Sequence, residues 1–386
     1  MKAGSYRPSR IERVVFGTPY LEAASAIVEE TGARRVFILA SRTLNRTTPL
    51  VEDLRRVLGA RHAGTFDEMP AHTPREAVVA AANAARAAGA DLLVTLGGGS
   101  LTDAAKAVVL CLSNDVRTEA LLDALRTRRG QPLPASIKAP TVRSIAIPTT
   151  MSAGEFMAYA GVTNRATGVK ETFFHPLAVA AYVILDPAVT LPTPMALWLS
   201  TGVRALDHAV EGYLSPQAQP YSQAADLQAL RLLPAALRRV HADPTDLDAR
   251  FDCQMGMWLS TVGSQSGVPK GASHAIGHLL GSWAGVPHGV TSCVMLPSVL
   301  RWNLPQNRAQ QVQVAAAMGA PDEDAAGFIE QLIRDLGLPS RLGEVGVTPD
   351  RLDELSHLCM HDAWIPTNPR HIAGPADVLE ILKLAS

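Results

Sequence analysis

Four of the eleven histidines in the chain occur in apolar segments or beside them, where imidazole rings could move protons or hold a metal ion. His274 and His278 are four residues apart in SHAIGHLLG, so a helix would place both on one face. His288 follows in VPHG, at an expected turn, and His208 lies in TGVRALDHAVEGY. A single histidine on an apolar helix is usually a core residue, but four in this arrangement indicate a site.

Arg204 lies one helical turn before His208, on the same expected helix face. A guanidinium group cannot ligate a metal, because it carries only donors and a fixed positive charge. It could stabilise an oxygen anion that forms during a reaction, or bind a substrate carboxylate through two parallel N–H donors. The alternative is a structural role for Arg204, as an ion pair with Asp207 or Glu211 or as a solvated side chain.

The sequence DLLVTLGGGSLTDAAKAV predicts a buried strand, a glycine turn and a helix. Glycines let the backbone turn tightly and approach a ligand, and the first amides of the helix suit a pyrophosphate. The spacing matches neither the GxGxxG fingerprint nor the P-loop, so an ordinary strand-to-helix turn stays open as the alternative. The residues that would contact the phosphates are Gly97, Gly98, Gly99 and Ser100.

The end of the next strand in the expected sheet bears on which dinucleotide would bind. Enzymes that prefer NAD tend to place an acidic side chain there, against the ribose 2′-hydroxyl. In this chain the strand at 35–40 is followed by Ser41 and Arg42, with Arg46 nearby and no carboxylate. This favours NADPH, or the use of both NADPH and NADH; the alternative is that the two arginines are simply solvated.

Short apolar segments alternate with helical ones in the first half of the chain, which is typical of a parallel sheet covered on both faces. From 187 onward the segments are rich in alanine and leucine, and no strands are expected. We therefore predict a Rossmann-like α/β domain over 1–186 and an all-helical domain over 187–386. The expected strands are 14–16, 35–40, 61–66, 91–96 and 144–148. The expected helices are 21–31, 48–58, 74–89, 101–113, 194–213, 222–240, 246–263, 272–285, 306–318 and 322–335, with a helix and a surface loop at 114–139.

Composition narrows the class of protein. The formal net charge is −1, and without a concentrated basic face the chain is not expected to bind nucleic acid. The four cysteines form no CxxC pair, so neither a zinc ribbon nor a disulfide framework is indicated. No apolar run is long enough for a membrane span or resembles a signal peptide, so a cytoplasmic protein is expected.

Several ordered motifs together resemble the iron-containing alcohol dehydrogenase superfamily, whose fold is related to that of dehydroquinate synthase. The chain is most similar to the maleylacetate reductase branch. The motifs are GGGSLTDAAKAV, IPTTMSAGEF followed by GVTN, VILDPAVTLPTP, TGVRALDHAVEGY and SHAIGHLLG with VPHG. They span nearly the whole chain, and their order and spacing make the resemblance specific.

The resemblance implies a role for each matching position. Residues 97–100 would hold the pyrophosphate of NADPH or NADH, and Asp103 and Lys170 would lie near the nucleotide. Thr149, Thr150 and Ser152 would line the nicotinamide and phosphate region. If a metal binds, its histidine ligands would be His208, His274 and His288, while His278 would lie close to the reacting centre. The family's fourth ligand is an aspartate four residues before the first histidine.

That fourth position is Arg204 in this chain, so we expect catalysis without a metal, as in the maleylacetate reductase branch. Arg204 and a protonated histidine would then stabilise the oxyanion that hydride transfer creates. His278 or His274 would supply the proton, and the catalytic set would be Arg204, His208, His274, His278 and His288. The expected substrate is a small, anionic carbonyl compound such as maleylacetate.

Three alternatives remain at this stage. The first is a metal-dependent alcohol dehydrogenase, and the second is a lyase resembling dehydroquinate synthase, for which Lys170 and Lys270 are the plausible phosphate ligands. The third is a nucleotide-binding protein without catalytic activity. The resemblance also implies a homodimer, with the strand at 14–16 as a possible pairing edge.

Overall fold

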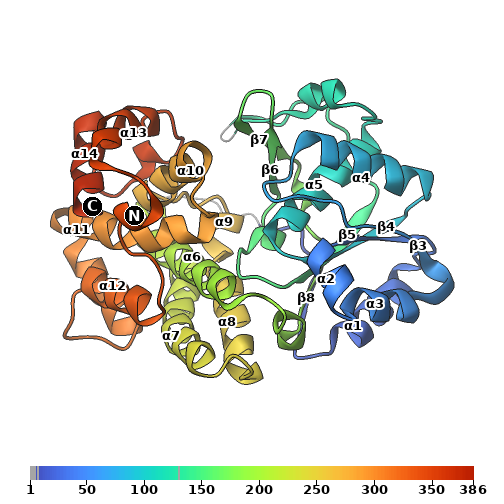
Figure 1. Ribbon diagram of the computed structural model, residues 1–386, viewed down its shortest axis with the longest axis horizontal. Coiled ribbons are helices and arrows are strands. Elements are labelled where there is room, and N and C mark those ends of the chain that lie inside the picture. The colour runs from blue at the N-terminus through green and yellow to red at the C-terminus, as the bar shows by residue number, and fades with distance from the viewer. Residues whose placement is uncertain (1–5, 7, 129–130) are drawn as a thin grey trace. The chain divides into compact units, whose positions relative to one another are not determined.

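The computed structural model describes residues 6, 8–128 and 131–386, which form two compact units. The first unit ends at Thr193 and the second begins at Pro194. Figure 1 colours the first unit from blue to green and the second from green to red. Among the described residues, no helix combines the length and the apolar character that a membrane span requires.

A six-stranded parallel sheet forms the centre of the first unit, with the strand order β1-β8-β5-β4-β2-β3. This confirms the predicted parallel sheet. One strand, β8, was not predicted. Its sequence YVIL is short and apolar, which is typical of a buried strand, and the turn residues Asp-Pro follow it. The strands are β1 (Arg13–Phe16), β2 (Val36–Ala40), β3 (His62–Phe66), β4 (Leu92–Gly97), β5 (Arg143–Pro148) and β8 (Tyr182–Leu185).

Helices cover both faces of this sheet, because successive side chains of each strand point to opposite sides. Val36 and Ile38 of β2 pack with one group of helices, whereas Phe37 and Leu39 pack with another. The first group comprises α1 and α3 and the second α4 and α5, on opposite sides of the sheet in Figure 1. The helices of this unit are α1 (Tyr20–Thr31), α2 (Arg42–Thr47), α3 (Leu50–Leu58), α4 (Arg75–Ala87) and α5 (Gly99–Ser113).

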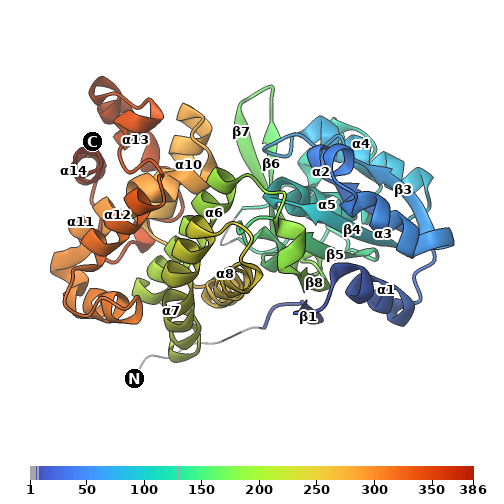
Figure 2. The same cartoon turned by 60° about the horizontal axis from the view of Figure 1, so that its bottom comes forward.

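An antiparallel hairpin of β6 (Tyr159–Asn164) and β7 (Val169–Phe174) was not predicted and projects from the first unit in Figure 2. Its strands, YAGVTN and VKETFF, mix polar and apolar residues and lack the longer apolar runs by which most of the other strands were predicted. The predicted helix within 114–139 is a 3-10 helix, Glu119–Leu125, and residues 129–130 lie outside the described part of the chain.

The described part of the second unit is helical, which confirms the predicted fold class. The main omission is the first part of α11, which begins at His288. The predicted helix at 306–318 corresponds to the part of α11 that follows Asn307, where the backbone departs from helical geometry. The last two helices were also missed. The helices are α6 (Met195–Leu214), α7 (Pro220–Ala242), α8 (Leu247–Leu259), α9 (Val262–Gln265), α10 (Ala272–Ala284), α11 (His288–Ala317), α12 (Ala325–Asp335), α13 (Leu352–Cys359) and α14 (Pro375–Leu384).

One buried acid lies in the core of the first unit. Glu155 is 1% exposed, and both of its carboxylate oxygens lack a hydrogen-bond partner among the described residues. It lines a small cavity with Thr95, whose hydroxyl is also unpartnered, and with Lys106, whose ammonium group donates to the carbonyls of Gly154 and Tyr159. Burial raises the pKa of Glu155 to about 7; among smaller effects, Lys106 lowers this pKa and Asp103 raises it further.

Replacing Glu155 with glutamine should remove a pH-dependent loss of stability. A carboxyl group whose pKa is higher in the folded state stabilises the fold below about pH 4.5, and this contribution is lost as the pH rises through about 7. Between these limits, the wild-type free energy of unfolding should fall by about 3 kcal/mol more than that of Glu155→Gln. Urea denaturation from pH 4.5 to 8 measures this. The exposed Glu22→Gln control should follow the wild type, and parallel profiles for Glu155→Gln and the wild type would contradict the assignment.

Candidate active site

The predicted catalytic side chains come from three helices of the second unit. Arg204 and His208 lie on α6, His274 and His278 on α10, and His288 is the first residue of α11 instead of a turn residue. Small residues allow these helices to approach closely. A Cβ atom at Gly289 would lie 2.8 Å from the backbone of Ser200 on α6, and one at Gly277 would lie 2.9 Å from Thr291 Oγ1 on α11.

The four predicted histidines gather in one place. The rings of His208 and His274 stack with their centroids 5.0 Å apart, and those of His278 and His288 stack at 5.8 Å. Trp364 connects the two pairs, because its ring meets the edge of His274 at 5.6 Å and lies 5.0 Å from His278. The structure therefore assembles an imidazole cluster from segments that are far apart in the sequence.

Arg204 is 4% exposed and its guanidinium group lies within this cluster. Nη1 donates to Ser292 Oγ at 3.0 Å and Nη2 donates to His288 Nε2 at 3.1 Å. Asp207 Oδ2 lies 3.9 Å from Nη1 and accepts a hydrogen bond from Ser292 Oγ at 2.6 Å. Because a guanidinium group can only donate, His288 must accept at Nε2, and this nitrogen carries no proton. Burial lowers the pKa of Arg204, while Asp207 and Glu211 favour its charged form.

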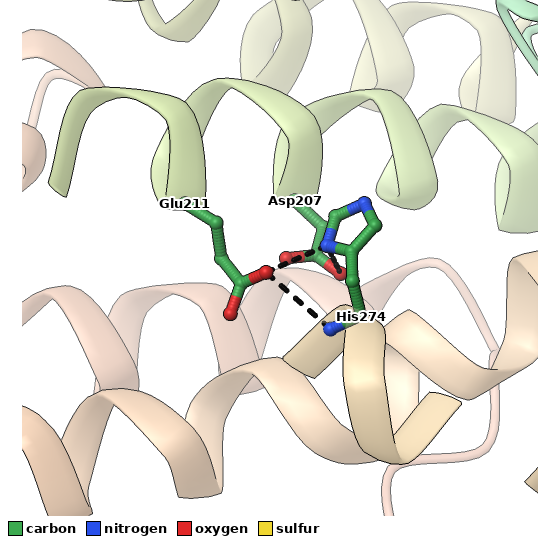
Figure 3. Close-up of side chains that lie close together, drawn as sticks. All are labelled: Asp207, Glu211 and His274. Atoms are coloured by element: carbon green, nitrogen blue, oxygen red, sulfur yellow. Dashed lines mark hydrogen bonds and ion pairs between the residues drawn. The ribbon is translucent and has the colours of Figure 1, made fainter. Parts of the chain in front are cut away.

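Glu211 and Asp207 both lie beside Nδ1 of the buried His274 ring (Figure 3). His274 Nδ1 lies 2.7 Å from Glu211 Oε2 and 3.5 Å from Asp207 Oδ2. His274 Nε2 has no hydrogen-bond partner among the described residues, and the residue is 1% exposed. Burial lowers the pKa of His274 well below its usual value, and burial together with Asp207 raises the pKa of Glu211 to about 8. The charged forms of His274 and of Glu211 are therefore both disfavoured.

His278 is also paired with a carboxylate, and its side chain is more accessible than that of His274. Its Nδ1 lies 2.9 Å from Asp362 Oδ2, and its side chain is 33% exposed. Asp362 is itself oriented, since its other oxygen accepts a hydrogen bond from the amide of Trp364 at 2.9 Å. A carboxylate on Nδ1 fixes the orientation of the ring.

His208 differs from the other histidines because no described side chain bonds to its Nδ1. Its backbone carbonyl accepts a hydrogen bond from Lys270 Nζ at 2.6 Å. Burial, Arg204 and Lys270 all lower the pKa of His208 well below its usual value, so the ring is neutral at physiological pH.

The residues present do not fit the metal site of the related family. The resemblance places Arg204 where the family has its aspartate ligand, and Nη2 of Arg204 donates to His288 Nε2, which engages the lone pair that this nitrogen would need to coordinate a metal. Among the described residues, the candidate ligand atoms that converge belong to Asp207, Glu211 and His274 and not to three histidines. The carboxylates are already hydrogen-bonded to His274 (Figure 3) and also to neighbouring amides and hydroxyls.

The predicted glycine turn of the first unit connects β4 to α5. Gly97 has φ +154°, and a Cβ atom there would overlap the side chain of Leu101. A Cβ atom at Gly99 would lie 2.8 Å from Ser152 Oγ. Within the described chain, no group accepts a hydrogen bond from the amides of Gly99 and Ser100. Glycine is therefore required in this turn because other side chains of the unit pack against it, and the free amides of Gly99 and Ser100 are donors that fit a dinucleotide phosphate.

The other predicted cofactor residues lie around this turn. The Cβ atom of Ser41 would be 3.3 Å from one at Gly97, Thr150 lies against Gly98, and the amide of Thr149 donates to the carbonyl of Gly97. Asp103, one turn into α5, lies 2.7 Å from Lys106 Nζ and 3.9 Å from Lys170 Nζ. The structure thus brings every predicted cofactor residue into one neighbourhood.

Sequence reasoning missed several residues of the imidazole cluster. Glu211 could have been found, because it continues the helical spacing of Arg204 and His208 on one face of α6. Asp362, Trp364 and Ser292 gave no such signal, because they reach the site from distant segments of the chain.

Comparisons with known proteins agree with this architecture. Residues 12–187 match the family described as iron-containing alcohol dehydrogenase, and residues 198–386 match the C-terminal part of the Fe-containing alcohol dehydrogenase family. The dehydrogenase FUM7 of Gibberella moniliformis is 32% identical, over 97% of this chain and 96% of the relative. Maleylacetate reductase 1 of Cupriavidus pinatubonensis is 30% identical, over 96% and 93%.

One solved structure extends the comparison of the fold. The sulfoacetaldehyde reductase from Bifidobacterium kashiwanohense, determined in complex with NAD+, matches with a TM-score of 0.89 at 22% identity and covers both chains completely. The chain belongs to the iron-containing alcohol dehydrogenase family and is an oxidoreductase.

Removal of the Arg204 charge should destabilise the second unit. Arg204→Met leaves Asp207 buried without its cation and His288 Nε2 without its donor, which should cost about 3 kcal/mol of unfolding free energy. Arg308→Met on the exposed part of α11 is the matched control and should change little. Adding Asp207→Asn to Arg204→Met should recover part of the loss in denaturant titrations. Equal stability of Arg204→Met and the wild type would show that this charge pair contributes nothing.

Proposed function

We propose that this protein is an NAD(P)H-dependent reductase of a small, anionic oxoacid such as maleylacetate and that it works without a catalytic metal. The observation that carries the proposal is the imidazole cluster with Arg204 at the position of the ligand aspartate. The maleylacetate reductases among the relatives support the substrate class.

The first unit would bind the dinucleotide. The phosphates of the dinucleotide would accept hydrogen bonds from the free amides of Gly99 and Ser100, and Thr150 and Ser152 lie beside these amides. The bound nicotinamide supplies a hydride, which is the chemistry of the cofactor itself. Arg42 forms an exposed ion pair with Glu68 at 3.3 Å, so its charge is already partly compensated and is less suited to bind a ribose 2′-phosphate. We therefore propose that both NADH and NADPH are accepted.

The second unit would stabilise the negative charge that forms on the carbonyl oxygen and would supply the proton that this oxygen takes up. As the hydride adds to the carbonyl carbon, the π electron pair moves to the oxygen, and the resulting alkoxide takes a proton to give the alcohol. His288 cannot supply this proton from Nε2, because that nitrogen accepts from Arg204. We assign the transfer to His278, which is partly exposed and paired with Asp362, and the stabilisation of the oxygen to the buried positive charge of Arg204.

Arg204 would act on this oxygen at a distance. Both of its terminal nitrogens are engaged, with Ser292 and His288, so its contacts favour a fixed positive charge over a fork that grips a carboxylate. Lys270 is occupied by the carbonyl of His208 and Lys170 lies beside Asp103, which argues against the phosphate-binding set of a lyase.

Oxidation of NADH or NADPH, followed by absorbance, should occur with maleylacetate and related oxoacids and be much slower with neutral aldehydes. Arg204→Ala and His278→Gln should each lower kcat by about 100-fold or more, because each removes a group that acts on the developing charge or proton. Cofactor binding without turnover of any carbonyl compound would favour the non-catalytic alternative.

Metal content tests the second part of the proposal. After dialysis and elemental analysis, the wild type should hold well below one iron or zinc per chain. Arg204→Asp recreates the ligand aspartate of the family and should bind about one metal per chain, whereas Arg308→Asp should not. Stoichiometric metal in the wild type that is lost in His274→Ala would overturn the metal-free mechanism and favour the metal-dependent dehydrogenase.

A further inference from the structure

We propose that Thr73 is a positioning residue that directs the hydroxyl group of Ser100 toward the phosphates of the dinucleotide. This inference rests on the proposed function, because it requires a dinucleotide at the glycine turn between β4 and α5. Its starting point is the backbone of the loop before α4. His72 and Thr73 are consecutive residues with φ +65° and +53°, a left-handed conformation that residues other than glycine rarely adopt.

Backbone strain of this kind is concentrated around the glycine turn. In the described chain, four residues other than glycine have a positive φ: His72, Thr73, Asp115 and Ala153. The first two bond to Ser100, and Ala153 directly follows Ser152, which lies against Gly99. Thr73 is the most unusual of the four, because it is β-branched and 1% exposed. Strained backbone persists only where neighbouring contacts hold it, and it is typical of ligand-binding sites.

Two hydrogen bonds connect this loop to the first turn of α5. Thr73 Oγ1 donates to the backbone carbonyl of Ser100 at 2.9 Å, and the amide of His72 donates to Ser100 Oγ at 3.2 Å. A serine hydroxyl group has a single proton to donate. Because Ser100 Oγ accepts from His72 and no group of the described chain accepts its proton, this proton remains for a phosphate oxygen.

The hairpin holds the same loop from the other side. Thr163 Oγ1 on β6 donates to the carbonyl of His72 at 2.7 Å, and the amide of Thr163 donates to the carbonyl of Thr73 at 3.0 Å. The strained loop is therefore fixed between β6 and the start of α5. Once a contact on either side is lost, the strain should relax and move the amide of His72 away from Ser100 Oγ.

Thr73→Val tests this role, because it keeps the volume of the side chain and removes only the donor to Ser100. It should raise the dissociation constant for ADP-ribose about tenfold, as the loss of an oriented hydrogen bond to a charged group typically does. ADP-ribose contains the pyrophosphate and lacks the nicotinamide, and calorimetric titration measures its binding. The constant for NADH should rise equally, whereas kcat with maleylacetate at saturating NADH should change less than twofold.

Three variants separate positioning from a merely structural role, which would alter stability but not these constants. Thr73→Ser retains the hydroxyl group and should bind ADP-ribose as the wild type does. Thr31→Val is the matched control, because Thr31 Oγ1 also donates to a carbonyl, that of Ile27 at 2.8 Å, but lies near the start of β2, at the opposite edge of the sheet. Ser100→Ala should weaken binding at least tenfold, and Thr73→Val should add nothing in that background.

Wild-type affinity in Thr73→Val, or multiplicative losses in the double variant, would overturn the positioning role. If Thr73→Val does not fold, Thr163→Val decides, because it removes the contact on the other side of the loop. It should raise the dissociation constant for ADP-ribose about threefold, and an unchanged constant would overturn the role. Binding of ADP-ribose without turnover of any oxoacid would refute the proposed reductase and leave the role of Thr73 intact, whereas no binding to the wild type would refute both.

Discussion

A positive charge that cannot be neutralised lies buried in the second unit, and much of the local structure serves to accommodate it. Arg204 is almost inaccessible to solvent, and a guanidinium group remains charged under nearly all conditions. Its compensation comes from Asp207, partly through the hydroxyl of Ser292, which accepts from the arginine and donates to the carboxylate. The same guanidinium group determines which nitrogen of His288 is unprotonated: because a guanidinium group can only donate, Nε2 of His288 must accept.

This constraint distributes tasks among the remaining imidazoles. His274 and His278 each have a carboxylate on Nδ1, whereas His208 has none in the described chain and is neutral. Carboxylate-oriented histidines are equally the arrangement in which proteins hold metals. In the account proposed here, the chain has kept this orientation, and an organic cation has replaced the electrostatic contribution of a metal ion.

Much of the fold could be predicted from the sequence, because buried strands and amphipathic helices have distinct periods. The hairpin of β6 and β7 could not, since its strands mix polar and apolar residues and their pairing depends on contacts with the rest of the unit. The part of α11 before Asn307 was missed; it contains Pro297, a residue that normally disfavours a helix interior but is buried within this helix.

The residues of the candidate site were likewise only partly predictable from the sequence. Spacing on a helix places His274 beside His278 and Arg204 beside His208, and the family resemblance adds the cofactor residues. The contacts of Ser292, Asp362 and Trp364 depend on how distant helices pack, and one sequence carries no signal for that packing.

The most direct measurement of the central claim is anomalous diffraction at the iron and zinc absorption edges, from crystals grown with NADH and each metal in excess. The account predicts no anomalous peak within bonding distance of His208, His274 or His288, and density for Arg204 Nη2 against His288 Nε2. A peak coordinated by these three rings, with Arg204 turned away, would contradict it.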